Sequence, residues 1–437
     1  MACCLPTGCD VLPAVVEPLD RDVDALLTEL IRNTQLSNVG DFKLSPSYIL
    51  YMGCRHRVSV HYEPTLTPTQ RVAQLEDFLT KTVNYLSLTI QDNYNCHDSS
   101  ALAFLLSNGM ELHHFMRSDA TLAPVTEPRQ TLAATLEEAF GRLASACRRD
   151  LDAAMERMVD RQLADDEATE ACVRQLSETV SLARACRLNA DLTVRLFCHQ
   201  FHHVNVYLFN CLVGPKGADY CSSVWAAQLA RRLNTLQGWA LDHGLEMAAD
   251  CYLDKITQAA RLLATPKRLE QLGQLCATCY SLNIVQVRLL LETFKAESPE
   301  DAPSAELVRR MVAIAEKEAD ETLRAQGLPI QLEQEVDLKM DFILPDAGFS
   351  TDYVVGIPSG LTTFADSLAK SGLCRMIPQH STGSSLSTAS ALSAHRRVVV
   401  RSIPLPLTTR GVMPLVQFFP TFCSFDLCEV VATVEWW

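Results

Sequence analysis

The segment "FCHQFHHVNVYLFN", from Phe197 to Asn210, brings together three histidines and one cysteine. Zinc is bound in proteins by side chains of the types found here at Cys198, His199, His202 and His203. His199 and His203 are four positions apart, a spacing that places two imidazoles on one face of a helix. The segment therefore raises the question of a metal site.

A helical arrangement of this segment argues against a metal. On a helical wheel, one narrow apolar stripe, the pattern of a buried seam, contains Phe197, Phe201, Val204 and Leu208. The opposite side holds His199, His203 and Asn210. A single helix thus presents at most two histidines to one metal, and no acidic or cysteine ligand lies nearby in the sequence. We expect polar contacts between helices and no metal-binding residue. The alternative is a structural metal that takes further ligands from elsewhere in the chain.

Other motifs that carry chemistry are missing or incomplete. One C-x-x-C occurs, at Cys276 and Cys279, but no second pair lies at a spacing suited to zinc. The residues before it look helical, whereas a thioredoxin-type motif follows a strand. The sequence has no G-x-x-x-x-G-K-[ST], H-E-x-x-H or G-x-S-x-G. We therefore predict that the chain is not an enzyme, with no catalytic residue and no cofactor. A cytosolic metal- or Cys/His-dependent hydrolase is the alternative.

Composition narrows the class of protein further. The formal net charge is −14 and the pI is about 5.3, the opposite of the basic balance that nucleic-acid binding requires. No apolar run is long enough to span a bilayer, and the N-terminus lacks the basic start of a signal peptide. Many of the 17 cysteines lie within helical patterns, as small buried side chains do in a reducing compartment. The sequence predicts a cytoplasmic protein.

Helical patterns continue to about residue 325 and predict an all-α fold, an elongated multi-helix bundle. Thr67, Pro68 and Gln70 form a capping box with proline at the first helical position. Asn189 is suited to cap a helix that ends at Val213, before Gly214 and Pro215. One continuous helix is expected from Leu245 to Leu263.

Changes of pattern along the chain predict four parts. Residues 1–39 are an N-terminal lead-in, 40–298 the helical bundle, and 299–380 an acidic helical extension. Residues 381–437 combine a Ser/Thr-rich linker with a short, irregular, β-prone tail that is too small to bury its own apolar side chains. From residue 297 to 346 acids outnumber bases, which favours partners with basic amphipathic helices.

The stretch "CRLNADLTVRLFCHQFHHVNVYLFNCLV" resembles the dilute (DIL) domain, a helical module of class V myosin tails and of afadin/canoe junctional scaffolds. The family pattern is a Phe-rich helix that runs into Asn-x-x-Leu-Phe-Asn. The residues that match it, to which the resemblance assigns a structural role, are Phe197, Phe201, Asn205, Leu208, Phe209 and Asn210.

Blocks such as "KLSPSYILYMGCRHRVSVHYEPTLTPTQR" and "CATCYSLNIVQVRLLLETF" extend the resemblance over residues 40–379, closer to afadin than to the myosins. Leu105 departs from it, because the family usually has Trp there. The resemblance implies a protein-interaction module of a cytoplasmic adaptor, located at adherens junctions, that links cell–cell adhesion to actin. Its implied partners are proteins, amphipathic helices or peptides, including junctional and actin-associated proteins. A myosin V-type cargo-binding adaptor is the alternative.

Overall fold

The structure is a computed structural model that describes residues 14–18, 22–59, 62–298, 301–318, 328–338, 340, 342–346, 348 and 359–378. The chain divides into a large unit, Met1–Ile377, and a second unit, Pro378–Trp437. The predicted linker and tail, residues 381–437, lie outside the described residues. All that follows concerns the large unit and the strand that ends at Pro378.

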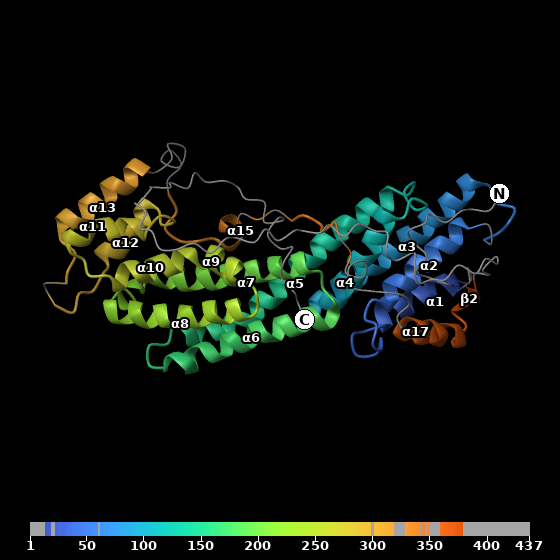
Figure 1. Ribbon diagram of the computed structural model, residues 1–437, viewed down its shortest axis with the longest axis horizontal. Helices are drawn as coiled ribbons and strands as arrows, with labels where there is room; N and C mark the ends of the chain where they lie inside the picture. Colours follow the sequence, from blue (N-terminus) through green and yellow to red (C-terminus); the bar gives the residue numbers. More distant parts are fainter. Residues whose placement is uncertain are drawn as a thin grey trace, which may run out of the picture. The chain divides into compact units, whose positions relative to one another are not determined.

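The described part of the chain is built from helices, with one two-stranded sheet, and the predicted all-α fold is confirmed (Figure 1). The N-terminal half contains β1 (Ala14–Pro18), α1 (Val23–Leu27), a π-helix (Thr28–Asn33), α2 (Ser45–Val58), α3 (Pro68–Asn95), α4 (Ser99–Ser118), α5 (Glu127–Met158) and α6 (Asp165–Cys186). The remainder contains α7 (Ala190–Val213), α8 (Ser223–Asp242), α9 (Glu246–Tyr252), α10 (Asp254–Ala264), α11 (Leu272–Ala277), α12 (Ile284–Glu292), α13 (Ala305–Glu318), α15 (Gln334–Asp337), α17 (Ser359–Lys370) and β2 (Cys374–Pro378). Short 3-10 turns lie at Gly217–Asp219 and Leu269–Gln271.

Local signals set several helix ends. Before α3, the Thr67 side chain accepts from the Gln70 amide while Gln70 accepts from the Thr67 amide, which is the predicted capping box. Before α7, the side chain of Asn189 accepts from the Asp191 amide, and the helix ends at Val213 before Gly214. These ends were predictable because each depends on residues a few positions apart.

The helix expected from Leu245 to Leu263 is wrong as a single element. The chain breaks at Leu253 into α9 and α10. The reason lies in α7, where the buried side chain of Asn205 accepts a hydrogen bond from the Ile256 amide at 2.9 Å. Asn205 thus caps the first turn of α10, whose free amides need an acceptor.

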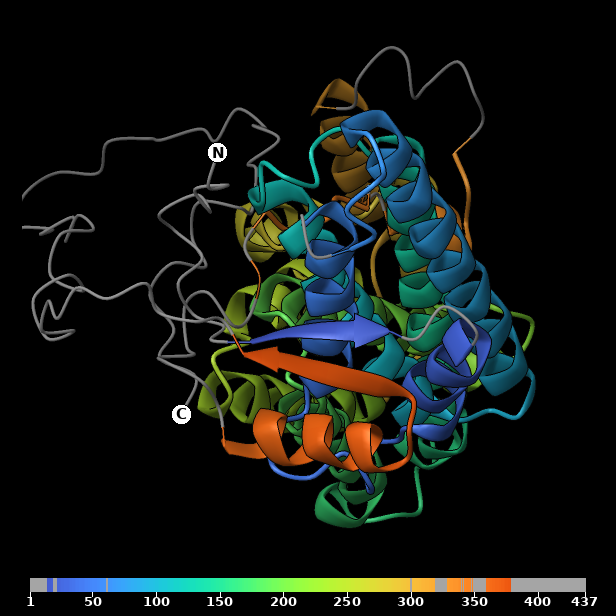
Figure 2. The same ribbon diagram turned by 90° about the vertical axis from the view of Figure 1, so that its right-hand side faces the viewer.

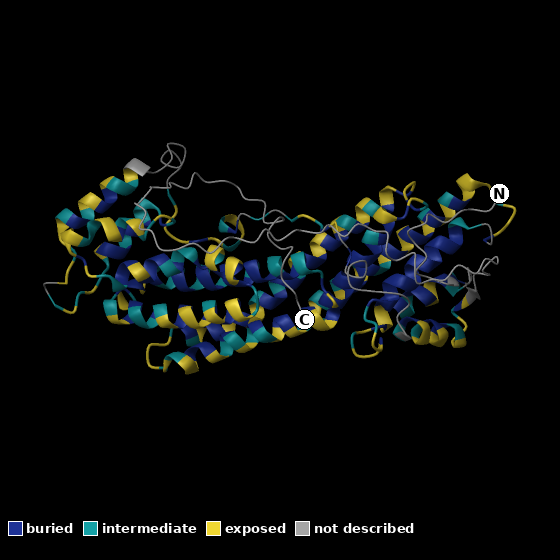
Figure 3. Ribbon diagram, viewed as in Figure 1, coloured by how far each residue is buried: buried dark blue, intermediate teal, exposed yellow. Residues whose placement is uncertain are grey.

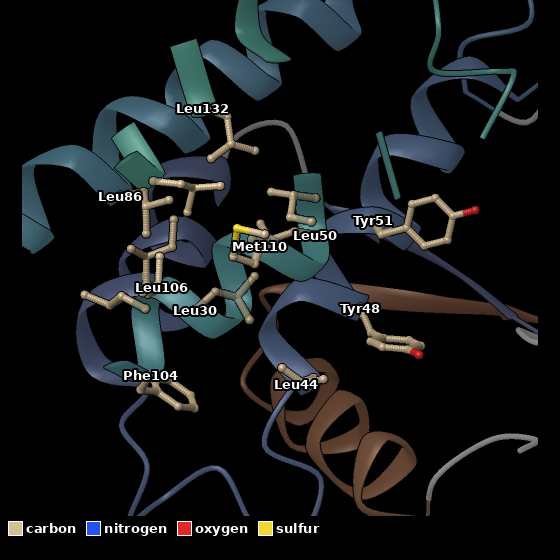
Figure 4. Close-up of a cluster of buried hydrophobic side chains, with 14 of the residues drawn as sticks. Leu30, Leu44, Tyr48, Leu50, Tyr51, Leu86, Phe104, Leu106, Met110 and Leu132 are labelled. Atoms are coloured by element: carbon tan, nitrogen blue, oxygen red, sulfur yellow. The ribbon is translucent and has the colours of Figure 1, made fainter. Parts of the chain in front are cut away.

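A continuous hydrophobic core joins the helices from α1 to α6 and the first turn of α7 (Figures 3 and 4). Residues of the lead-in contribute to it: Val16, Leu27 and Leu30 are at most 1% exposed. α17 adds Leu361, Ala365 and Leu368 to the same core and lies against α2. Beside it, β1 pairs with β2, and Figure 2 shows the two strands running in opposite directions.

We call residues 328–346 the strap; the structure describes 328–338, 340 and 342–346. The strap crosses the bundle from α12 to α4 and is held by side chains of the helices it passes. Near its start, Asn283 and Gln286 of α12 donate to the carbonyls of Pro329 and Ile330 at 2.7 and 3.0 Å. Near its end, His114 of α4 lies 3.2 Å from the Asp346 carbonyl.

Among the described residues, no helix is both long enough and apolar enough to cross a membrane.

Candidate functional site

Helix α7 is the central element of the candidate site. One of its sides packs inside the bundle, and the other faces the strap. On the inner side, four residues of the family pattern are at most 1% exposed: Phe197, Phe201, Leu208 and Phe209. The rings of Phe197 and Trp239 of α8 lie 5.8 Å apart. This side anchors α7 in the bundle and leaves the other side to face the strap.

The two asparagines of the pattern each hold the backbone of another segment. Asn205, 2% exposed, caps α10 as described above. Asn210, which is half-buried, makes a pair of hydrogen bonds with Leu332 of the strap: its amide donates to the carbonyl at 2.9 Å and its oxygen accepts from the N–H at 2.8 Å. The pattern therefore serves structure, since α7 positions both α10 and the strap.

The three histidines of α7 have different surroundings. His203 Nε2 is 2.9 Å from Asp152 Oδ1 of α5, and its Nδ1 is 3.3 Å from Gln334 Oε1 of the strap. His199 packs edge-on against the ring of Phe140, with centroids 5.5 Å apart. Burial lowers the pKa of His199 to about 4, and the nearby Arg148 guanidinium adds to this shift. Burial also lowers the pKa of His202, against the opposing Asp337 carboxylate.

Cys198 is the fourth side chain of a metal-ligand type in this segment. It is buried, and burial raises the pKa of its thiol to about 12. Within the part of the chain that the structure describes, no group of three or more His, Cys, Asp or Glu side chains is arranged to hold a metal ion. The structure brings His203 to the strap and leaves Cys198 in the core.

Three acidic residues of the strap pair with basic residues of the bundle. Glu335 lies 2.9 Å from Arg148, Asp337 lies 3.5 Å from Lys255, and Asp346 pairs with Arg117. The partners are 82 to 229 positions away in sequence, so a count of local charge cannot reveal them.

A groove of about 780 Å³ opens where four elements meet: the end of α3, the middle of α5, the outer side of α7, and α15 of the strap. Helix α15 contacts α7. Its wall and floor include Tyr94, Arg148, Arg149, Asp152, Val206, Tyr207 and Glu335. Of the residues singled out in the sequence, His203 and Asn210 line it. Sequence reasoning missed the rest, although two consecutive arginines within the span of the apolar stripe of α5 were a visible signal.

The arrangement suits binding. The floor offers half-buried carbon surface from Tyr94, Val206 and Tyr207, and its rim carries charged groups that can fix orientation. Arg149 stacks over the ring of Tyr94, with its Cζ atom 5.1 Å from the ring centroid.

Comparison with known proteins finds a family match for part of the site. Residues 195–298 match the family model of the DIL domain. Helix α7, apart from its first turn, lies within the matched residues, together with α8 to α12, so the outer side of α7 that lines the groove lies within the match.

Curated relatives of the chain include myosins. Myosin-2 of Saccharomyces cerevisiae and Myosin-2 of Saccharomyces uvarum are each 29% identical over 119 residues, which is 27% of this chain and 7% of the myosin. The region of similarity thus spans a small part of those relatives.

Solved structures share the fold over most of the chain. The yeast myosin 5 cargo-binding domain matches with a TM-score of 0.58 at 17% identity, over 80% of this chain and 98% of that one. The Myo2-GTD in complex with Smy1 matches with a TM-score of 0.57 at 17% identity and the same coverage. At this level of identity the likeness shows the fold.

These findings correct the function implied by the sequence. The resemblance to a dilute domain is confirmed in the DIL match, but the afadin/canoe assignment is not supported. The expected adherens-junction adaptor is wrong, because the relatives and structures found are myosins and myosin cargo-binding domains.

Proposed function

We propose that the chain is a protein-binding module of the myosin V cargo-binding type, and that it performs no catalysis. The observation that carries this proposal is the fold shared with the yeast myosin 5 cargo-binding domain over 80% of the chain. Related domains have been solved in complex with Smy1, Mmr1 and Inp2, which supports proteins as the class of partner. The cytoplasmic location expected from the sequence stays a prediction.

The groove between α5, α7 and the strap is the part of the surface best suited to receive a partner. It combines apolar floor with charged rim, as recognition grooves for peptides and helices do. Three of its sides are set by long helices, so its shape is largely formed before binding, and such pre-formed sites lose less conformational entropy on association.

Site-specific photo-crosslinking tests the proposed function. A benzophenone amino acid replaces Tyr207 in the groove, and in a matched variant it replaces Leu241 of α8, which is 64% exposed and not part of the groove lining. We expect irradiation in cell lysate to link discrete proteins to position 207 and not to position 241. Equal labelling at both positions, or labelling at 241 alone, would contradict a partner site in this groove.

A further inference from the structure

The charged side chains that line the groove differ in whether they have a partner of opposite charge. Of its two carboxylates, Asp152 is held by His203 at 2.9 Å and Glu335 by Arg148 at 2.9 Å. Arg149 differs: within the described part of the chain its guanidinium stacks on Tyr94 and makes no hydrogen bond or ion pair. The groove therefore presents a cation whose donors have no acceptor among the described residues.

The stacked position of Arg149 prepares it for a planar anion. A guanidinium over an aromatic face keeps the edges of its fork free, and those edges match the two oxygens of a carboxylate. The ring of Tyr94 restrains the side chain, so less conformational freedom is lost when an acceptor arrives. Arg149 is exposed, so an incoming group reaches it without displacing another residue.

The apolar floor of the groove sets a second requirement on a ligand, in addition to an anion for Arg149. Val206 and Tyr207 project from the outer side of α7, and both are only half-buried. Covering their carbon surface is favourable by about 25 cal/mol for each Å² removed from water. A ligand that fits the groove needs an apolar side chain for this floor as well as an anion for Arg149.

We propose that the groove binds a segment of a partner protein in which a Glu or Asp lies close to an aromatic or branched aliphatic side chain. The carboxylate pairs with Arg149, and the apolar side chain covers Val206 and Tyr207. This inference rests on the proposed protein-binding function and specifies the chemistry of the partner. It differs from the preference for basic helices expected from the acidic residues 297–346; three carboxylates of the strap are already paired within the chain.

Glu335 strengthens the assignment, because the strap already places a carboxylate at this rim. The carboxylate of its pair with Arg148 is open to water: the Glu335 side chain is 72% exposed, whereas that of Arg148 is 15% exposed. Such pairs contribute little to stability, under about 1 kcal/mol, and are readily exchanged. A partner with two acidic residues can therefore engage Arg149 first and compete with Glu335 for Arg148.

Peptide display tests the proposal with a defined probe. A random dodecapeptide library is selected on the full chain and depleted on a Tyr207→Arg variant, so that the survivors are peptides that require the groove. We expect survivors with net negative charge and an aromatic, Leu, Ile or Val residue near an acid. Survivors that are neutral or basic on average would overturn the proposal.

Titration of individual survivors assigns the role of Arg149. Fluorescence anisotropy should show about tenfold weaker binding to Arg149→Glu, a smaller loss with Arg149→Lys, and a change under about twofold with Arg174→Glu. Arg174 is a matched control on α6: its side chain is 61% exposed and it is not part of the groove lining. Equal losses in the Arg149 and Arg174 variants would overturn the proposal, as would none in either. Thermal melts of all four proteins establish that each is folded.

Two outcomes separate this inference from the proposed function. If position 207 crosslinks to proteins while the selected peptides show no acidic preference, the groove binds partners but not by this chemistry. If the chain dimerises through the groove, light scattering will show a dimer that Arg149→Glu dissociates, and the occupant is a second copy rather than a partner. Both results overturn the acidic-partner proposal.

Discussion

Two arginines in this protein stack on aromatic rings at the same distance, yet their surroundings differ in every other respect. Arg232 of α8 lies over Trp225, and Arg149 of α5 lies over Tyr94, each 5.1 Å from the ring centroid. Arg232 is fully buried, whereas Arg149 is exposed. The difference teaches that stacking alone does not define a role.

What defines the role of Arg232 is that its donors are satisfied. Its guanidinium bonds Asp165 Oδ1 at 3.1 Å and the carbonyls of Met158, Asp160 and Leu163 at 2.7 to 2.9 Å. These acceptors span the connection between α5 and α6, so Arg232 fixes that turn. Arg149 has a ring but no acceptor in the described structure, which leaves it available to a partner.

The largest expected effect comes from removing the buried arginine. Arg232→Met removes the buried donor to Asp165 Oδ1 and to three carbonyls, and losing one partner of a buried ionic network costs about 3–5 kcal/mol. The matched control is Arg231→Met, because Arg231 also bonds Asp165, at 2.7 Å, but its side chain is 61% exposed. Urea unfolding should show a loss under about 1 kcal/mol for the control. Similar losses of unfolding free energy in the two variants would contradict the distinction between the buried and the exposed arginine.

Lowering the pH should reduce the free energy of unfolding through His199 of α7. The pKa of His199 is about 4 in the folded chain, because of burial and the Arg148 charge, against an ordinary value of 6.5. Between these pH values the unfolded chain takes up the proton first, so stability is highest above pH 6.5 and falls as the pH drops toward 4. Each such group contributes at most about 1.4 kcal/mol per pH unit.

The variant His199→Phe should therefore show a shallower loss of unfolding free energy between pH 6.5 and 4. It keeps an aromatic ring against Phe140 but cannot be protonated. Asp165→Asn, at the carboxylate that pairs with the buried Arg232, serves as the control. Although burial opposes it, hydrogen bonds from Arg231 and Arg232 hold the pKa of Asp165 below its ordinary value, so this group does not titrate in that range. Parallel pH profiles for wild type and His199→Phe would contradict the assignment.

The asparagines of α7 repeat the contrast on a smaller scale. Asn205→Ala should cost about 1–2 kcal/mol, since it leaves the buried Ile256 amide at the start of α10 without an acceptor. Asn210→Ala should cost less, because Asn210 is only half-buried. Its effect should instead appear as faster hydrogen exchange at the Leu332 amide. A larger global loss from Asn210→Ala would mean that the strap is an integral part of the folding unit.

The smallest effect on stability is expected at the rim of the groove. Glu335→Gln breaks a pair with Arg148 whose carboxylate is 72% exposed, and it should change the unfolding free energy by less than about 1 kcal/mol. It should nevertheless tighten binding of the selected acidic peptides, by about threefold, because Arg148 no longer has an internal competitor. Weaker peptide binding in this variant would show that Glu335 supports the groove rather than competing for it.

Sequence reasoning succeeded where the deciding contacts are local. The cap at Asn189 and the capping box at Thr67 depend on neighbours within three positions, and the buried seam of α7 follows from helical periodicity. It failed where contacts are distant. The break at Leu253 depends on Asn205, and the charge of the strap is neutralised by arginines and a lysine far along the chain.

The groove was missed for the same reason. Tyr94, Arg149, Tyr207 and Glu335 belong to four separate elements, and nothing in the periodicity of any one of them indicates that they meet. The distinction between an arginine that is held and one that is free depends on burial and on acceptors in distant loops. Neither quantity can be read from spacing along one helix.

The pairing of β1 with β2 has a mechanical consequence. Because the strands run in opposite directions, the first residue of β1, Ala14, lies toward the end of β2 at Pro378 (Figure 2). A pull that separates these two points loads the inter-strand hydrogen bonds one after another, as in unzipping, and each yields at low force. Tension applied there would part the strands before it reached the packed helices.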